Sequence, residues 1–412
     1  MLVHASGILF ADIPSSCRWR QRRVSLGTAL SVYDIPIRLR RGATGTSSRL
    51  PSGRAPPVRG VQNRPPPPNR GGRPAVFLRS QAVKHCFVTG GAGFIGSHLV
   101  EHLLGQGHRV SVVDDESTGS IDNLKQVIDH PHLEYTRGTV ADRQLVRRRL
   151  LSADEVYHLA AAVGVQLIAR SPIHTIEANI YPTEVILDEL GRMHQDGHKV
   201  KLFLASTSEV YGKNPKPIYE EGDDLVFGPT TRPRWSYGVS KAIDEFLALA
   251  YFTERGLPVV VGRFFNVVGP RQTGAYGMVL PRFIDAALAG RPLIVHDDGQ
   301  QTRCFAHVAD VIYAMTALMD TPRAAGRVFN IGSESPITIL DLARKVTAAI
   351  HPELPIEFQS YEDAYSVNFE DCRARVPSLA KLRSVIPYEP KHTLDAIIQE
   401  IIAWKKDEPH GP

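Results

Sequence analysis

The chain has 412 residues, of which 43% are hydrophobic and 22% are charged, and its formal net charge is +5. No apolar run approaches the ~18 residues that a membrane helix needs. The four cysteines, Cys17, Cys86, Cys304 and Cys372, have no metal-ligand spacing. These features argue against a transmembrane protein, a metal site and a disulfide scaffold, and they predict a reduced, cytoplasmic protein.

The first 82 residues differ in composition from the rest of the chain. They hold 14 arginines, no lysine, only two acids (Asp12 and Asp34) and 10 of the 30 prolines. Their net charge is +12, which leaves −7 for residues 83–412, so the basic pI does not indicate a nucleic-acid partner for the folded part. Such a composition predicts a disordered tail or a segment read from an upstream start codon, and an organellar transit peptide is the less favoured alternative.

A strand, a glycine turn and a helix are predicted just after this tail. A short apolar run ends at Gly90, and apolar residues then recur at helical spacing from Phe94 and Ile95 onward. Gly90 permits a tight turn, Gly93 lets the backbone approach a pyrophosphate, and Gly96 lets the helix lie close to the strand. The N–H groups at the helix N-terminus would then bind the phosphates of a dinucleotide.

An acid at the end of the next predicted strand selects between the two nicotinamide cofactors. Asp114 stands 18 residues after Gly96. A carboxylate at this place binds the hydroxyls of the adenosine ribose and repels a 2′-phosphate. The sequence therefore predicts NAD rather than NADP.

Strand and helix patterns alternate along the chain, which predicts an α/β fold, a Rossmann-type doubly wound parallel sheet with a smaller C-terminal substrate-binding lobe. We expect sheet strands at 85–89, 108–113, 132–136, 155–159, 200–205 and 258–264, and helices at 94–104, 142–150, 172–193 and 236–255. Pro182 is expected to kink the third helix. The NAD-binding domain is expected at 83–269. Residues 270–412 are expected to form mainly the lobe, with short strands at 293–296 and 327–331 and helices at 279–289, 308–319, 338–350 and 393–405.

Two motifs carry the candidate chemistry. Thr207, Ser208 and Glu209 follow a predicted strand, at the edge of the sheet where ligands bind. Tyr237 and Lys241 are four residues apart and share one face of a predicted helix. A cation beside a phenol favours the phenolate, so Lys241 is expected to lower the pKa of Tyr237 and make it a general base, with Thr207 as hydrogen-bond donor.

These motifs occur in a fixed order along the chain. They are Thr89-Gly-Gly-Ala-Gly-Phe-Ile-Gly96, Asp114 followed by Ser117-Thr-Gly119, His158-Leu-Ala-Ala161, Ser206-Thr-Ser-Glu-Val-Tyr-Gly212, Tyr237 with Lys241, and Arg263-Phe-Phe-Asn266 leading to Gly269-Pro-Arg271. Over residues 84–405 the chain resembles the extended short-chain dehydrogenase/reductase family, in its nucleotide-sugar epimerase/dehydratase group.

The resemblance implies a role for each matching residue. Thr207, Ser208, Glu209, Tyr237 and Lys241 would be catalytic. The NAD site would comprise Gly90, Gly93, Phe94, Ile95, Gly96, Asp114, Thr118, Gly119, Val140, Leu159, Ala160 and Ala161, together with Tyr237 and Lys241. Asn266, Arg271, Arg303 and Arg375 would bind the nucleotide sugar, which is expected to be UDP-linked. The chain departs from the family at Thr139, where an acid often stands, and at Pro182, which replaces a glycine.

The resemblance leaves the reaction open beyond a shared first step, in which Tyr237 takes the proton of the sugar 4-hydroxyl and a 4-keto sugar forms. The loop Ala162-Val-Gly-Val-Gln-Leu is more similar to epimerases, so a UDP-sugar 4-epimerase is the first expectation. UDP-glucuronate decarboxylase follows closely, because Thr207-Ser-Glu209 and Arg375 resemble that group. Other nucleotide-sugar dehydratases and a non-catalytic NAD-sensing member are further alternatives.

The family resemblance also implies a homodimer. In this family two long helices of each subunit form an interface by pairing with those of a second copy, and here these are the helices expected at 172–193 and 236–255. Ile186, Phe246, Leu249 and Ala250 would supply its apolar contacts.

Overall fold

The computed structural model describes residues 82–164, 171–274, 277–364 and 372–407. Its centre is a seven-stranded parallel sheet with the strand order β11-β6-β5-β4-β1-β2-β3. The strands are β1 (His85–Thr89), β2 (Arg109–Asp114), β3 (Leu133–Arg137), β4 (Glu155–His158), β5 (Lys201–Thr207), β6 (Val259–Phe264) and β11 (Arg327–Ile331). The order reverses between β1 and β4, and ligands of open parallel sheets bind at such a point.

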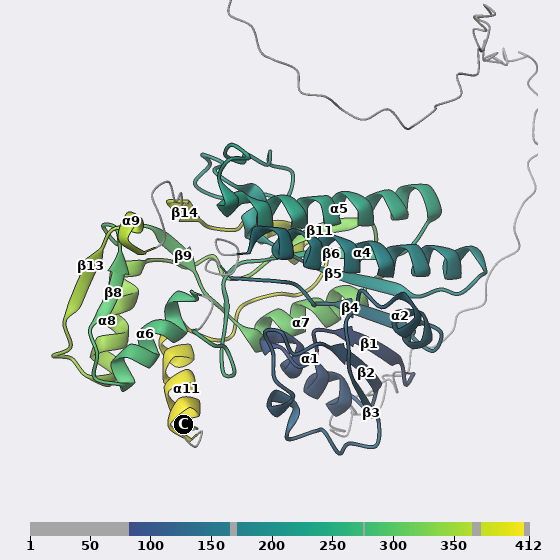
Figure 1. Cartoon of the computed structure of the whole chain (residues 1–412), viewed down its shortest axis with the longest axis horizontal. Coiled ribbons are helices and arrows are strands. Elements are labelled where there is room, and N and C mark those ends of the chain that lie inside the picture. The colour runs from purple at the N-terminus through teal and green to yellow at the C-terminus, as the bar shows by residue number, and fades with distance from the viewer. Residues whose placement is uncertain (1–81, 165–170, 275–276, 365–371, 408–412) are drawn as a thin grey trace, which may run out of the picture. The chain divides into compact units, whose positions relative to one another are not determined.

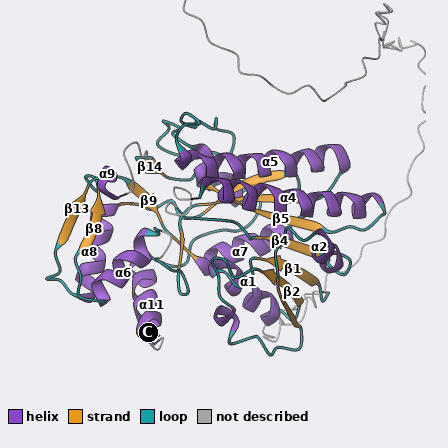
Figure 2. Ribbon diagram, in the orientation of Figure 1, coloured by secondary structure: helices purple, strands orange, loops and turns teal. Residues whose placement is uncertain are grey.

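Helices cover both faces of the sheet (Figures 1 and 2). They are α1 (Phe94–Gly105) and α7 (Val308–Met319) on one face, and α2 (Arg143–Leu150), α4 (Pro172–Gln195) and α5 (Ser236–Arg255) on the other. Successive residues of a strand point to opposite faces, so Cys86 and Val88 pack with α1 and α7 while Phe87 packs with α2 and α4. The nearly continuous apolar strands of the sequence follow from this burial on both faces.

One expectation about domain organisation needs correction. The sequence predicts that the segments at 308–319 and 327–331 belong to the substrate lobe, but in the structure they form α7 and β11 of the NAD-binding domain. Arg327 to Ile331 pair in parallel with Val260 to Phe264, so β11 extends the main sheet beyond β6. The chain thus leaves the sheet after β6, begins the lobe, and returns to the sheet before completing the lobe.

The lobe has its own hydrophobic core, made mainly by α6 (Val279–Leu288), α8 (Ile339–Ile350) and α11 (Leu394–Asp407). Its strands are β8 (Leu293–His296) with β13 (Ile356–Gln359), and β9 (Thr302–Cys304) between β12 (Pro336–Thr338) and β14 (Ala374–Arg375). A short pair, β7 (Val267–Val268) and β10 (Ala306–His307), lies where the chain passes between lobe and sheet. The remaining short elements are α9 (Tyr361–Ala364), α10 (Ala380–Arg383) and the 3₁₀ helices η1 (Ile121–Leu124), η2 (Ser208–Tyr211), η3 (Pro233–Trp235) and η4 (Pro322–Ala324).

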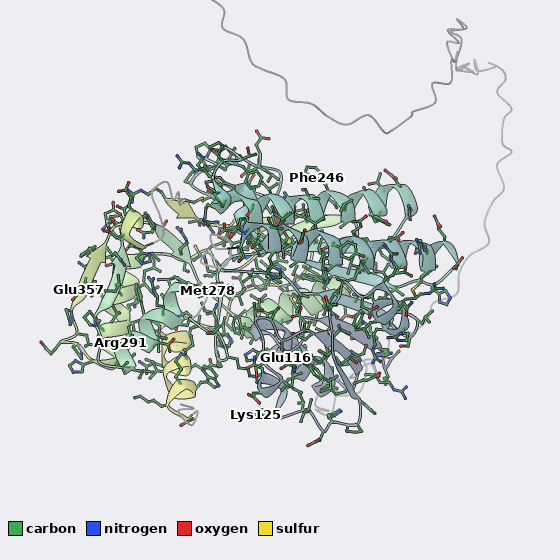
Figure 3. All side chains as sticks on the ribbon, in the orientation of Figure 1. Glu116, Lys125, Phe246, Met278, Arg291 and Glu357 are labelled. Carbon is green, nitrogen blue, oxygen red and sulfur yellow. The ribbon has the colours of Figure 1, made fainter. Side chains whose placement is uncertain are left out.

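The two long helices α4 and α5 lie side by side, and α4 continues through Pro182 as a single 24-residue helix. Both carry large apolar side chains on their outer surfaces, such as Phe246 of α5 (Figure 3). Ile186 is instead fully buried in the core against the sheet, so the expected interface contact of this residue is wrong. No helix among the described residues is both long and apolar enough to cross a membrane.

Candidate functional site

The glycine turn after β1 is built by contacts that only glycine allows. Gly90 has a φ of +72°, and a Cβ atom there would lie 2.7 Å from the backbone nitrogen of Ala160. A Cβ atom on Gly96 would lie 2.0 Å from the carbonyl oxygen of Gly90. These two positions therefore bring the start of α1 directly against the end of β1. The N-cap of α1 is Gly93, which has no side chain to cap the helix.

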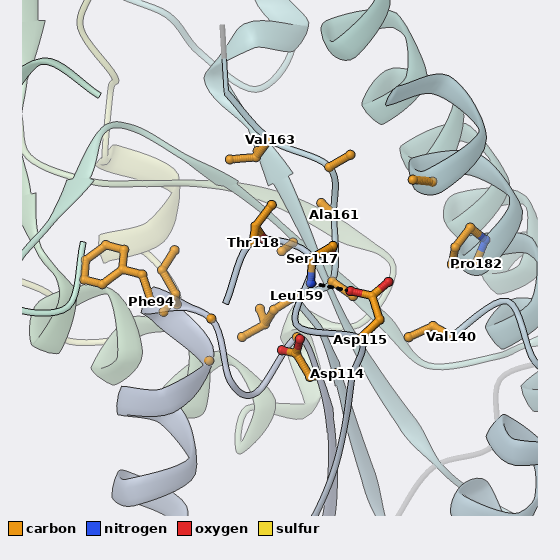
Figure 4. A pocket seen from close by; sticks show the side chains of 18 of the residues that line it. Phe94, Asp114, Asp115, Ser117, Thr118, Val140, Leu159, Ala161, Val163 and Pro182 are labelled. Atoms are coloured by element: carbon orange, nitrogen blue, oxygen red, sulfur yellow. Dashed lines mark hydrogen bonds between the residues drawn. The ribbon is translucent and has the colours of Figure 1, made fainter. Parts of the chain in front are cut away.

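A cavity of about 780 Å³ lies at the carboxyl ends of the central strands (Figure 4). Its walls come from the glycine turn, the ends of β2 and β3, the loop after β4, and one face each of α4 and α5. It includes Gly90, Gly93, Phe94, Ile95, Gly96, Asp114, Thr118, Val140, Leu159, Ala160, Ala161, Tyr237 and Lys241. Gly119 packs behind this wall, where its Cβ would lie 2.6 Å from the Ala92 carbonyl oxygen.

The carboxylate of Asp114 is oriented by two backbone groups. It accepts hydrogen bonds from the N–H of Ala92 at 2.9 Å and from the N–H of Glu116 at 2.8 Å. Burial raises the pKa of Asp114 above its ordinary value, and the two N–H donors oppose this rise. The neighbouring Asp115 also lines the cavity and accepts a hydrogen bond from the N–H of Ser117 (Figure 4).

A buried hydrogen-bond chain supports the loop after β4. The hydroxyl of Thr89 lies 2.7 Å from Nδ1 of His158, and Nε2 of His158 lies 3.1 Å from the hydroxyl of Thr183 on α4. The Thr183 hydroxyl donates to the carbonyl oxygen of Asn179, so it accepts from Nε2–H of His158, and Nδ1 of the neutral ring accepts from the Thr89 hydroxyl. The N–H of Ala160 donates to Thr89 in turn. Burial, with a smaller contribution from Lys241, lowers the pKa of His158 to about 3 and keeps the ring neutral. This chain sets the position of Leu159 and Ala160 in the cavity wall.

Tyr237 lies in the first turn of α5, where it is only 7% exposed. The Thr207 hydroxyl lies within hydrogen-bond reach of its phenol. Burial, and next the Glu209 carboxylate, raise the pKa of Tyr237 above its ordinary value. The sequence predicts the opposite direction, because a cation beside the phenol favours the phenolate. In the structure the Lys241 ammonium is paired with Asp244 at 2.8 Å, and this negative charge offsets it.

Glu209 is held between two arginines. Arg234 of η3 binds both carboxylate oxygens, with Nη2 2.9 Å from Oε1, and Arg375 of β14 binds Oε1 as well. Burial raises the pKa of Glu209, but the two guanidinium groups outweigh it and hold the pKa well below its ordinary value. Glu209 is therefore ionised at any physiological pH, and Ser208 is buried beside it. Arg375 also stands opposite Arg303 in the register of β14 and β9.

The other expected substrate residues lie outside the cavity that the described residues form. Asn266 has a φ of +31° and donates from Nδ2 to the carbonyl oxygen of Cys304, and Arg303 donates to the carbonyl oxygen of Cys372 at 2.9 Å. Arg271, also expected to bind the nucleotide sugar, is paired with an acid of the sheet domain. Its guanidinium group donates to both carboxylate oxygens of Glu101 on α1 at 2.8 Å, which fixes the lobe connection to the sheet domain.

Sequence reasoning missed two residues at the site. Arg234 stands three residues before Tyr237, and Asp244 three residues after Lys241. The spacing of Lys241 and Asp244 is that of an ion pair along one helix face, which is a detectable signal. Arg234 has no such signal in the sequence, because its partner Glu209 is far along the chain and belongs to another element.

The residues of the cavity fit NAD. The turn brings backbone close to where a pyrophosphate would lie, the N-terminus of α1 has no side-chain cap or acid in its first turn, and Asp114 offers a carboxylate to ribose hydroxyls. Such a carboxylate disfavours the additional phosphate of NADP. Leu159, Ala160 and Ala161 supply a mainly apolar wall between these groups and Tyr237.

Comparisons with known proteins agree with this geometry. The family described as GDP-mannose 4,6 dehydratase matches residues 87–401. A UDP-N-acetyl-alpha-D-glucosaminuronate decarboxylase of Bacillus cytotoxicus is 37% identical over 79% of this chain and 98% of its own length. UDP-glucuronic acid decarboxylase 1 of Arabidopsis thaliana is 33% identical over 82% of this chain and 74% of its own length.

The solved structures include a UDP-glucuronic acid 4-epimerase from Bacillus cereus in complex with UDP-glucuronic acid and NAD. It is 26% identical to this chain, covers 78% of it and 99% of its own chain, and superposes with a TM-score of 0.70. The fold, the ordered motifs and these matches lead to one conclusion. The chain belongs to the extended short-chain dehydrogenase/reductase family, in its NAD-dependent nucleotide-sugar epimerase/dehydratase group.

Proposed function

We propose that this enzyme decarboxylates a UDP-linked hexuronic acid through a 4-keto intermediate. The observation that carries the proposal is the ion cluster of Glu209 with Arg234 and Arg375. The relatives named UDP-glucuronic acid decarboxylase and UDP-N-acetyl-alpha-D-glucosaminuronate decarboxylase support the same reaction class. The proposal thus favours the decarboxylase alternative over the 4-epimerase that was the first expectation from the sequence.

The composition of the cluster suits a uronate. Two guanidinium groups gather around the Glu209 carboxylate, and all three side chains are mostly buried. Guanidinium groups bind carboxylates with two parallel hydrogen bonds, and a guanidinium group has five N–H donors. The cluster could therefore bind a second carboxylate, that of the sugar C6, whereas a neutral hexose offers no such group.

Residues already placed in the cavity wall would hold the cofactor. The glycine turn would bind the pyrophosphate, Asp114 and Thr118 the adenosine ribose, and Val140 the adenine side. Leu159, Ala160 and Ala161 would lie along the nicotinamide side. Bound NAD supplies the acceptor for the hydride of sugar C4 and its return after carboxylate loss.

Tyr237 and Thr207 would manage the proton of the sugar 4-hydroxyl. The phenol oxygen of Tyr237, once ionised, takes this proton as C4 becomes a carbonyl, and Thr207 donates a hydrogen bond at the same place. The C5–C6 bond then breaks because its electron pair enters the adjacent C4 carbonyl, which releases CO₂ and leaves an enolate. Arg375 and Arg234 would orient the departing carboxylate. A proton from solvent then enters at C5 and restores the C4 carbonyl, and Tyr237 returns its proton to the C4 oxygen as the hydride returns to C4.

Product analysis tests the reaction directly. Purified protein with NAD should convert UDP-glucuronate, or its 2-acetamido analogue, to the UDP-pentose with release of CO₂, as read by NMR and carbonate trapping. UDP-glucose and UDP-N-acetylglucosamine should remain unchanged. A C4 epimer that retains C6 would reject the proposal and establish the second candidate, a 4-epimerase, which the Bacillus cereus neighbour favours.

Matched arginine variants test the cluster. Arg375→Ala should reduce turnover of the uronate strongly, because it removes a group that binds the C6 carboxylate. Arg373→Ala is the control, since Arg373 lies two residues away and pairs at the surface with Asp298 at 2.7 Å. Tyr237→Phe should reduce turnover by about 10²–10⁴, the range for loss of a positioned general base, while leaving NAD binding intact. Equal activities of the two arginine variants would contradict the role of Arg375.

A further inference from the structure

Lys241 has a buried counterion within its own helix. Its Nζ atom lies 2.8 Å from Oδ2 of Asp244, and the two side chains are 3% and 0% exposed. A pair this deeply buried is costly to form unless its geometry is fixed, because both charges lose their hydration. The arrangement is therefore specific, and it ties the ammonium of the family's Tyr-x-x-x-Lys motif to a group outside that motif.

The pair changes the electrostatics around the phenol. An uncompensated ammonium would favour the phenolate of Tyr237, whereas a neutral ion pair exerts a much weaker field. The Asp244 carboxylate itself acts against ionisation of the phenol. The charged and titratable groups that face Tyr237 or this pair from the packed elements are Glu209 of η2, Arg234 of η3, His158 of β4 and Glu245 of α5.

We propose that Asp244 is a positioning residue that holds the Lys241 ammonium and offsets its charge, and thereby sets the pH at which Tyr237 releases its proton. Asp244 touches neither substrate nor cofactor in this role and acts only through Lys241 and through the field at the phenol. Thr183 of α4 also faces the Asp244 carboxylate, so the pair is anchored to both long helices. The inference rests on Tyr237 being the base of the proposed reaction, but it does not depend on which product forms.

Removing the charge of Asp244 should lower the pKa of Tyr237. Asp244→Asn keeps the side-chain volume and an oxygen that accepts a hydrogen bond from Lys241, but it removes one negative charge. The ammonium is then uncompensated, so the phenolate is stabilised and the pKa of Tyr237 falls. We expect a fall of about one pH unit or more, which corresponds to a tenfold change in ionisation.

Two measurements on the NAD-saturated protein test this. The first is an ultraviolet titration of phenolate absorbance on the native chain and on Asp244→Asn. For each protein, the titration curve of the same chain carrying Tyr237→Phe is subtracted, which leaves the absorbance of Tyr237. The second is the pH dependence of kcat/KM for whichever UDP-sugar is turned over. Both the titration midpoint and the ascending limb should move to lower pH by about one unit in Asp244→Asn. Asp395→Asn, which removes a charge from an exposed ion pair with Lys345, should move neither.

The outcomes separate this inference from its alternatives. If Asp244→Asn lowers kcat but leaves the ascending limb where it was, Asp244 is a merely structural partner and the inference is overturned. If Asp244→Asn does not fold, Asp244→Glu takes its place, since it keeps the charge and moves the carboxylate by one methylene. Asp244→Glu should lower kcat/KM and leave the ascending limb of its pH profile at the same pH. A shift of that limb would overturn the inference. Failure to release CO₂ would overturn only the decarboxylation, because the phenol titration needs no substrate.

Discussion

At the scale of single residues, the ion cluster of Glu209 predicts how the stability of the folded protein changes at acid pH. Its pKa is held below the ordinary value by Arg234 and Arg375, so the ionised form is stabilised by folding. The contribution is complete above the unfolded pKa of about 4.3 and is lost as the pH falls from there towards the lowered folded value. Glu209→Gln should therefore unfold more easily at pH 7 and show a smaller further loss on acidification than the native chain. Denaturant titrations at pH 7 and pH 3.5 measure both effects, and parallel losses in the two proteins would contradict the assignment.

Asp114 makes a prediction about cofactor choice. NAD should bind more tightly than NADP, because the carboxylate repels a 2′-phosphate. Asp114→Asn keeps one of the two oxygens that accept from the Ala92 and Glu116 N–H groups and removes the charge. The ratio of the dissociation constants for NADP and NAD should therefore fall by about tenfold, or ~1.4 kcal/mol. Since the pKa of Asp114 is raised by burial, the preference for NAD should weaken on mild acidification in the native chain but not in the variant. Calorimetry measures the constants, and equal affinities of the native chain for both cofactors would reject the role.

At the scale of elements, sequence periodicity predicted the helices and strands well and their partners less well. The pattern at 327–331 predicted a strand correctly, because an apolar run in extended structure is a local property. It could not show that this strand pairs with β6, since that depends on where α7 leads the chain. The same reason explains why Tyr237 and Lys241 were found and Arg234 was missed. A motif five residues long is visible in the sequence, whereas a guanidinium group that reaches Glu209 across 25 residues is not.

The outer surfaces of α4 and α5 lead us to propose that the protein forms a homodimer. Val239, Ile243 and Phe246 follow one another at helical spacing and are exposed, with Phe246 at 70%. A continuous apolar strip of this kind is typical of a surface that a second copy covers. Phe246→Asp should convert a dimer to a monomer in light scattering at micromolar concentration. Phe358→Asp, at a separate exposed position on β13, should not. A native chain that is monomeric under these conditions would rule out the dimer.

At the scale of the whole molecule, the site and the fold that supports it lie within the described residues from position 82 onward. The seven strands, both helical layers and the cavity are all formed there. Residues 1–77 carry a formal charge of +11 and residues 78–412 a charge of −6, so the two parts also differ in the partners that their charges favour. We therefore expect the first 77 residues to be dispensable for NAD binding and for turnover.

A pair of truncated chains tests this expectation with a built-in control. A chain that begins at Leu78 should melt, bind NAD and turn over like the full chain. A chain that begins at His85 lacks in addition Lys84, whose ammonium binds Glu155 at 2.7 Å and Asp320 at 2.6 Å. Its loss leaves the buried Glu155 carboxylate with the Tyr157 hydroxyl as a remaining donor and should cost about 1–3 kcal/mol. Calorimetric melting of the three proteins decides the matter, because a large fall already in the Leu78 chain would show that the basic segment contributes to the fold.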